Sequence, residues 1–242
     1  MQRDPWIRRL RTTAGVSGSH MASTAELGES SLLPAAAVLT AAGLYATLPA
    51  RFIANSGGLI GAVRLVVPAV AVMLVVALVL AAPGKGRNAP VSRRTLMLAA
   101  IAMLALANIA SIYLLVHLIV NGHEVNGHDL IRAAIHIWCT NVIVFALGYW
   151  QLDAGGPRAR REGQRRPPDF LFPQAVAPEF ATPGWQTMFL DYVYVSFTNA
   201  IAFSPTDAMP LTRRAKMLML FQSSASLLLL AMVAARAVNI LH

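Results

Sequence analysis

The chain has 242 residues, of which 56% are hydrophobic and only 13% are charged. A water-soluble domain of this size cannot bury so large an apolar fraction, so the composition predicts a membrane protein. The formal net charge is +9, but the Lys and Arg residues lie in short clusters between apolar runs. This distribution is typical of membrane topology signals and argues against a nucleic-acid partner. One cysteine, Cys139, provides neither a disulfide framework nor a CxxC metal site.

Residues 1–30 are predicted to form a disordered or interfacial N-terminal arm. The string SGSHMAS at 17–23 resembles a vector-derived scar, so residues 1–23 are excluded from the fold prediction. The string IRRLRTTAG before an apolar run also permits reading the arm as a twin-arginine export signal, although the spacing to that run is long.

The region 31–152 is predicted to hold four transmembrane helices, because a spanning helix needs about 20 mostly apolar residues. These spans are 32–54, 60–82, 94–120 and 130–152, and a fifth is 215–240. Between them, 153–186 is rich in Arg and Pro and is predicted to be an irregular loop. Four aromatic residues suit the interfacial belts of a membrane protein: Trp138, Tyr149, Trp150 and Trp185.

The distribution of cations predicts the topology. If the N-terminus is cytoplasmic and 187–210 does not cross the membrane, 16 of the 20 Lys and Arg residues lie inside. If 187–206 spans instead, the division is 13 to 7. The positive-inside rule therefore predicts a multi-pass protein of the bacterial cytoplasmic (inner) membrane with a cytoplasmic N-terminus.

The segment 187–203 is too polar for a lipid-facing span, since it contains Asp191, Ser196, Thr198 and Asn199. A polar turn with Ser204, Pro205, Thr206 and Asp207 follows it, and then a long apolar helix. This order is typical of a re-entrant hairpin. Irregular backbone at membrane depth is tolerated only where protein or a water-filled cavity surrounds it, so the turn is a candidate pore or structural element.

Residues 189–241 resemble the pore module of two-helix potassium channels. The shared features are an aromatic-rich pore helix, a short turn ending in Asp207, a Pro-Leu-Thr entry at 210–212 and an inner helix that starts with a cation. The resemblance implies an oligomer, a tetramer if it is a pore, with the turn at its symmetry axis. The cation distribution gives the hairpin the inverted orientation found in glutamate-receptor channels.

The turn departs from the potassium-channel pattern. Potassium filters line their path with carbonyls of a glycine-containing loop, whereas residues 202–207 contain no glycine and Pro205 restricts the backbone. The expected lining is therefore an acidic ring of side chains from Ser204, Thr206 and Asp207. The alternative is a structural hairpin that caps the bundle through Asp207 or Thr212.

A wider resemblance combines WCTNVIVFALGYWQLDAGGP (138–157), FLFPQ (170–174) and the segment 189–241. Together they resemble a family of uncharacterised bacterial integral membrane proteins that is common in actinobacteria. That family brings no known activity with it.

Polar residues in the predicted helices are pore-facing or interhelical candidates: Asn141, Asn199, Gln222 and Ser226. Asn141 is expected to hydrogen-bond across helices. Thr212 is expected to cap the last helix, while the adjacent Arg213, Arg214 and Lys216 are assigned to topology or to anionic lipid headgroups.

The turn NGHEVNGHD at 121–129 offers His123 and His128 as metal ligands, but its spacing is not HExxH and polar turns often contain histidine. We predict no metal and no cofactor. The sequence contains no P-loop, GxGxxG or nucleophile–base motif, so no enzyme activity is predicted.

Together these features predict an all-α polytopic membrane helix bundle of about five transmembrane helices plus one short re-entrant hairpin, with 187–242 forming the hairpin and last span. The predicted function is an oligomeric cation pore without a potassium-type glycine filter. The alternative is a non-conducting structural or accessory membrane protein. Expected partners are the lipid bilayer, further copies of the chain and ions.

Overall fold

A computed structural model describes residues 32–48, 67–73, 76, 93–120, 127–161, 166–202 and 207–240. The named elements are α3 (Leu32–Ala46), α6 (Arg93–Val120), α7 (Gly127–Leu152), η1 (Asp153–Gly155), α8 (Pro157–Arg161), β1 (Phe170–Leu171), α9 (Pro173–Val176), η2 (Pro178–Phe180), α10 (Phe189–Ala202), β2 (Met209–Pro210) and α11 (Arg213–Ile240). The all-α prediction is confirmed, since the described strands are only β1 and β2, each of two residues.

Three helices in the described ranges are long and apolar enough to cross a membrane, and they indicate a membrane protein. They contain Arg94–Val120, Gly127–Gly155 and Arg213–Ala235, close to the predicted spans 94–120, 130–152 and 215–240. The first predicted span, 32–54, is described as a helix only over the 15 residues of α3. Most of the second, 60–82, and the N-terminal arm lie outside the described residues.

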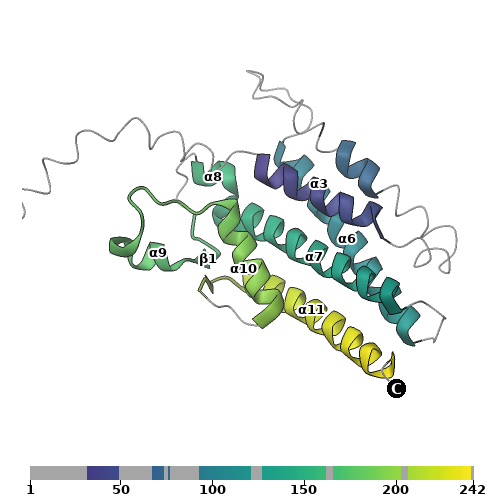
Figure 1. Cartoon of the computed structure of the whole chain (residues 1–242). Coiled ribbons are helices and arrows are strands. Elements are labelled where there is room, and N and C mark those ends of the chain that lie inside the picture. Colours follow the sequence, from purple (N-terminus) through teal and green to yellow (C-terminus); the bar gives the residue numbers. More distant parts are fainter. Residues whose placement is uncertain are drawn as a thin grey trace, which may run out of the picture. The chain divides into compact units, whose positions relative to one another are not determined.

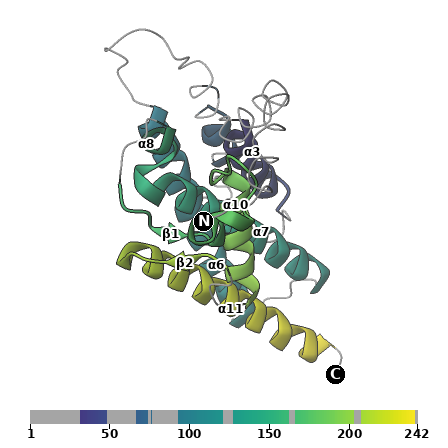
Figure 2. The same ribbon diagram turned by 90° about the vertical axis from the view of Figure 1, so that its left-hand side faces the viewer.

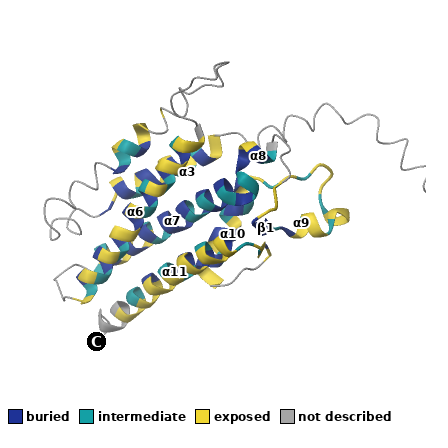
Figure 3. Ribbon diagram, turned by 180° about the vertical axis from the view of Figure 1, so that it is seen from behind, coloured by how far each residue is buried: buried dark blue, intermediate teal, exposed yellow. Residues whose placement is uncertain are grey.

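Helix α7 is the centre of the bundle, and it packs against α3, α6, α10 and α11 (Figure 1). Ala133, Ala134 and Ala146 are buried on it, and such small residues let neighbouring helices approach closely. Burial is concentrated on α7, while the outer helices alternate buried and exposed faces (Figure 3).

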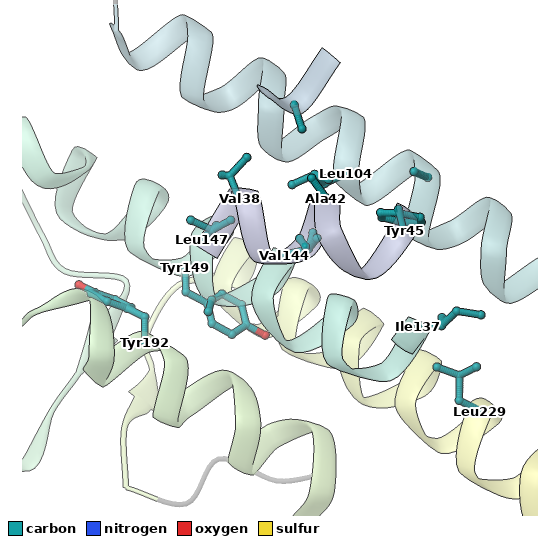
Figure 4. Close-up of a cluster of buried hydrophobic side chains, with 14 of the residues drawn as sticks. Val38, Ala42, Tyr45, Leu104, Ile137, Val144, Leu147, Tyr149, Tyr192 and Leu229 are labelled. Atoms are coloured by element: carbon teal, nitrogen blue, oxygen red, sulfur yellow. The ribbon is translucent and has the colours of Figure 1, made fainter. Parts of the chain in front are cut away.

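The apolar core between α3, α6 and α7 is built from interdigitating aliphatic side chains (Figure 4). Val38 and Ala42 of α3 lie beside Leu104 of α6 and Val144 and Leu147 of α7. These side chains are buried, so α3 belongs to the bundle and is not a loose flanking helix.

Helix α10 has 14 residues, which gives a length of about 21 Å at 1.5 Å per residue. It runs antiparallel to α7: Phe189 contacts Trp150 with ring centroids 5.8 Å apart, and Ser196 reaches the carbonyl of Val142. Its inner face buries Tyr192, Val195, Ser196 and Asn199, at helical spacing. Its outer face exposes Leu190, Tyr194, Phe197 and Ile201.

Strands β1 and β2 pair antiparallel, with Phe170 opposite Pro210 and Leu171 opposite Met209. The pair lies beside the start of α11 (Figure 2), and the Leu211 N–H donates to the Asp169 carbonyl over 2.8 Å. These hydrogen bonds join residues 169–171, which precede α9 and α10, to residues 209–211, which follow them.

Candidate functional site

The four pore-facing or interhelical candidates all lie inside the bundle, each at most 1% exposed. Asn141 comes from α7, Asn199 from α10, and Gln222 and Ser226 from α11. They belong to two separate groups of buried polar side chains, and each of the four forms a hydrogen bond with another helix.

Gln222 connects three helices. Its Oε1 accepts hydrogen bonds from the Tyr149 hydroxyl of α7 (2.6 Å) and from Asn199 Nδ2 of α10 (2.9 Å). Its Nε2 donates to both the carbonyl (2.8 Å) and the hydroxyl (2.7 Å) of Ser196. Both lone pairs of the amide oxygen and both amide hydrogens are thus used within the protein.

A second, separate hydrogen-bonded group connects α6 to α11 through α7. Asn108 Nδ2 donates to Asn141 Oδ1 over 3.1 Å, and Asn141 Nδ2 donates to the Ser226 hydroxyl over 3.0 Å. The expected cross-helix hydrogen bonds of Asn141 are confirmed. The roles of Asn108 and Tyr149 were not predicted, although each is a polar group within an apolar run.

Two aromatic residues differ from the belt prediction. Tyr149 and Trp150 are buried by protein, so the prediction of a headgroup-facing position is wrong for them. Tyr149 packs on Phe170, with centroids 5.0 Å apart, and Trp150 packs on Phe189. The loop that contains β1 and the start of α10 both cover this end of α7. The sequence of α7 alone does not predict that these segments pack there.

Asp153 organises the C-terminal end of α7. Its buried carboxylate accepts hydrogen bonds from the backbone N–H groups of Asp169 (2.6 Å) and Phe170 (3.1 Å) and from the Tyr192 hydroxyl (2.5 Å). One aspartate therefore holds α7, the β1 strand and α10 together. It escaped prediction because its partners lie 16, 17 and 39 positions away.

The turn at residues 154–156 reverses the chain, so that the loop after it can bring Asp169 back to Asp153. Ala154, Gly155 and Gly156 have φ values of 51°, 86° and 95°, a region that favours glycine. A Cβ at Gly155 would also lie 2.7 Å from Cδ of Arg166. The glycines thus allow the chain to reverse beside the end of α7.

Arg160 also stabilises the C-terminal end of α7. Its guanidinium donates to the carbonyls of Trp150 (3.1 Å) and Asp153 (2.8 Å), which lie at the end of α7. It also lies over the Tyr192 ring, 5.4 Å from the centroid. Carbonyls at a helix end lack intrahelical donors and are satisfied by such a cation.

Asp169 fixes the start of α11. It is 1% exposed and accepts two parallel bonds from Arg214, Nε to Oδ1 and Nη2 to Oδ2, each 2.6 Å long. The Thr212 hydroxyl donates to the same carboxylate and accepts from the Ala215 N–H over 3.3 Å. The predicted Thr212 cap is confirmed, and Arg214 has a buried carboxylate partner that was not predicted.

The Asp169 pair predicts an acid-sensitive contribution to stability. Burial raises the pKa of Asp169, but hydrogen bonds from Arg214 and Thr212 outweigh it, so the pKa is lowered overall. The contribution is therefore complete above the ordinary aspartate pKa of about 3.9 and is lost as pH falls through the lowered value. The free-energy difference between the parent and Asp169→Asn, measured by unfolding in detergent, should be constant at pH 5–7 and shrink below about pH 4. A difference independent of pH would contradict this assignment.

The predicted turn and metal residues are only partly within the described chain. Asp207 is exposed, while Ser204, Pro205 and Thr206 lie outside the described residues. His128 is exposed at the start of α7, and His123 also lies outside the described ranges. Within those ranges, no group of three or more His, Cys, Asp or Glu side chains is placed to hold a metal ion.

No family model, curated protein or solved structure matches the chain. The two resemblances drawn from the sequence stay predictions.

Proposed function

We propose that this is a channel-like integral membrane protein of the bacterial inner membrane, with five spans and a re-entrant hairpin over 187–210. The observation that carries the proposal is the anchoring of both flanks of α10 at one end of α7. Phe170 pairs with Pro210, and Asp169, which is bonded to Asp153, also binds Arg214. A full crossing by α10 would put its two flanks on opposite sides of the membrane.

The depth of α10 also supports a re-entrant segment. Asn199, close to the end of α10, donates to the Met219 carbonyl over 3.0 Å. Met219 lies six residues after Arg213 at the start of α11, which corresponds to about 9 Å along the helix. A bilayer hydrocarbon core is about 30 Å thick. This depth supports a hairpin in which α10 enters part of the membrane and the chain after it returns to the same side.

A conducting path would run between copies of the chain. Gln222, Ser226 and Asn141 are bonded inside one chain, so they are interhelical and do not line this path. The exposed Asp207 lies two residues before β2 and would form an acidic ring at the mouth of an oligomeric pore. Such a ring concentrates cations near the entrance.

Flux through liposomes tests the pore. We expect Asp207→Asn to reduce cation flux or cation selectivity at normal protein yield, because the variant removes the acidic ring. Glu179→Gln is the matched control, since it removes another exposed carboxylate from the loop before α10. Equal flux in the parent and Asp207→Asn would remove Asp207 from the pore.

A second candidate is a non-conducting structural or accessory membrane protein. The internally satisfied network around Gln222 favours it, because bonds used between helices leave no polar stripe for water. Absence of flux from the parent at every lipid composition, together with a monomer in mild detergent, would select this candidate. A tetramer with measurable flux would select the pore.

Thiol labelling tests the topology. In a background with Cys139 replaced, cysteines at the exposed positions Glu179, Asp207 and His128 should respond differently to an impermeant reagent in intact cells. We expect labelling at 128 only, since 179 and 207 flank the proposed hairpin on the cytoplasmic side. Labelling at 207 with protection at 179 would show that α10 crosses the membrane.

A further inference from the structure

The three cations at the start of α11 differ in their surroundings. Arg214 binds the buried Asp169. Arg213 and Lys216 are exposed, and neither forms an ion pair with an acidic residue in the described part of the chain. Two positive charges thus lie on the outer surface with no acidic partner among the residues that the structure describes.

Exposed residues continue along α11 (Figure 3), and those in line with the two cations are leucines. Residues three, four and seven positions apart share one face of a helix, so Arg213 and Lys216 align with Leu220 and Leu227. Leu220 is 56% exposed and Leu227 is 53% exposed. The face therefore presents cations at the end of the span and aliphatic side chains along its length.

We propose that Arg213 and Lys216 bind the phosphate of an anionic phospholipid, whose acyl chain lies along Leu220 and Leu227. Along the membrane normal, the charged headgroup of a phospholipid is followed by its acyl chains, just as the two cations of α11 are followed by the two leucines. Cytoplasmic leaflets contain anionic lipids that attract basic residues near the surface. The inference depends on membrane insertion with this end at the headgroups, and it does not depend on ion conduction.

The test compares lipid retention by native mass spectrometry of the detergent-purified full chain. The probes are phosphatidylglycerol, phosphatidylcholine and inorganic phosphate. We expect the parent to retain phosphatidylglycerol in preference to phosphatidylcholine. Arg213→Gln with Lys216→Gln should weaken the preference by roughly 30-fold, as expected for the loss of two surface cations.

The matched control is Arg94→Gln with Arg132→Gln, which removes two exposed cations from α6 and α7. It should keep the parent's preference. An equal loss in both double variants would overturn the site, because general charge would then explain binding. Displacement of the lipid by millimolar inorganic phosphate would overturn the acyl-chain contact. If the double variant fails to fold, Lys216→Gln alone should lose at least threefold of the preference, and an unchanged preference would overturn the proposal.

Discussion

Replacing Asp153 by alanine is expected to destabilise the protein by about 3–5 kcal/mol. The substitution removes the acceptor for two backbone N–H groups and the Tyr192 hydroxyl. The backbone N–H groups of Asp169 and Phe170 would lose this buried acceptor, and each buried donor left unsatisfied costs about 1–3 kcal/mol. Thermal unfolding in detergent, followed by tryptophan fluorescence, measures the loss.

Asp153→Asn is the matched control. The amide oxygen can still accept from the two backbone N–H groups, and the amide nitrogen can donate to the Tyr192 oxygen, since a hydroxyl also accepts. We therefore expect a loss of about 1 kcal/mol. Equal destabilisation by alanine and asparagine would show that the negative charge, and not the hydrogen-bond geometry, holds this corner.

Gln222→Leu is expected to lower stability by about 2 kcal/mol, because it leaves buried polar groups on α7 and α10 without partners. Single interhelical bonds in membranes average about 0.6 kcal/mol, and Gln222 serves three partner residues. Ser226→Ala is the comparison one turn further along α11. It removes a single bond, from Asn141, and should cost about 0.6 kcal/mol.

The two α11 variants also separate a structural network from a water-lined one. If the hydrogen bonds of Gln222 only join helices, the ion flux normalised to the amount of folded protein should be the same in Gln222→Leu as in the parent. Loss of flux at unchanged unfolding temperature would falsify the interhelical assignment, because a residue facing water in a conduction path changes flux without changing packing.

The sequence by itself determined the membrane class and the principal helices. Runs of about 20 apolar residues are a local property, and a bilayer makes length and hydrophobicity nearly sufficient to specify a span. The predicted limits of α6, α7 and α11 therefore agree closely with the structure. The Thr212 cap was equally local, since its hydroxyl bonds to the N–H of Ala215 three residues later.

The tertiary structure alone decided which polar residues meet. Asp169 and Arg214 are 45 positions apart, and Tyr149 and Gln222 are 73 apart. Their pairing requires the left-handed turn at 154–156 to reverse the chain and β1 to pair with β2. Helical periodicity identifies the face on which a side chain lies, but it contains no information about which distant backbone will cover that face. The end of α7 was therefore predicted to face lipid headgroups, and it is instead covered by protein.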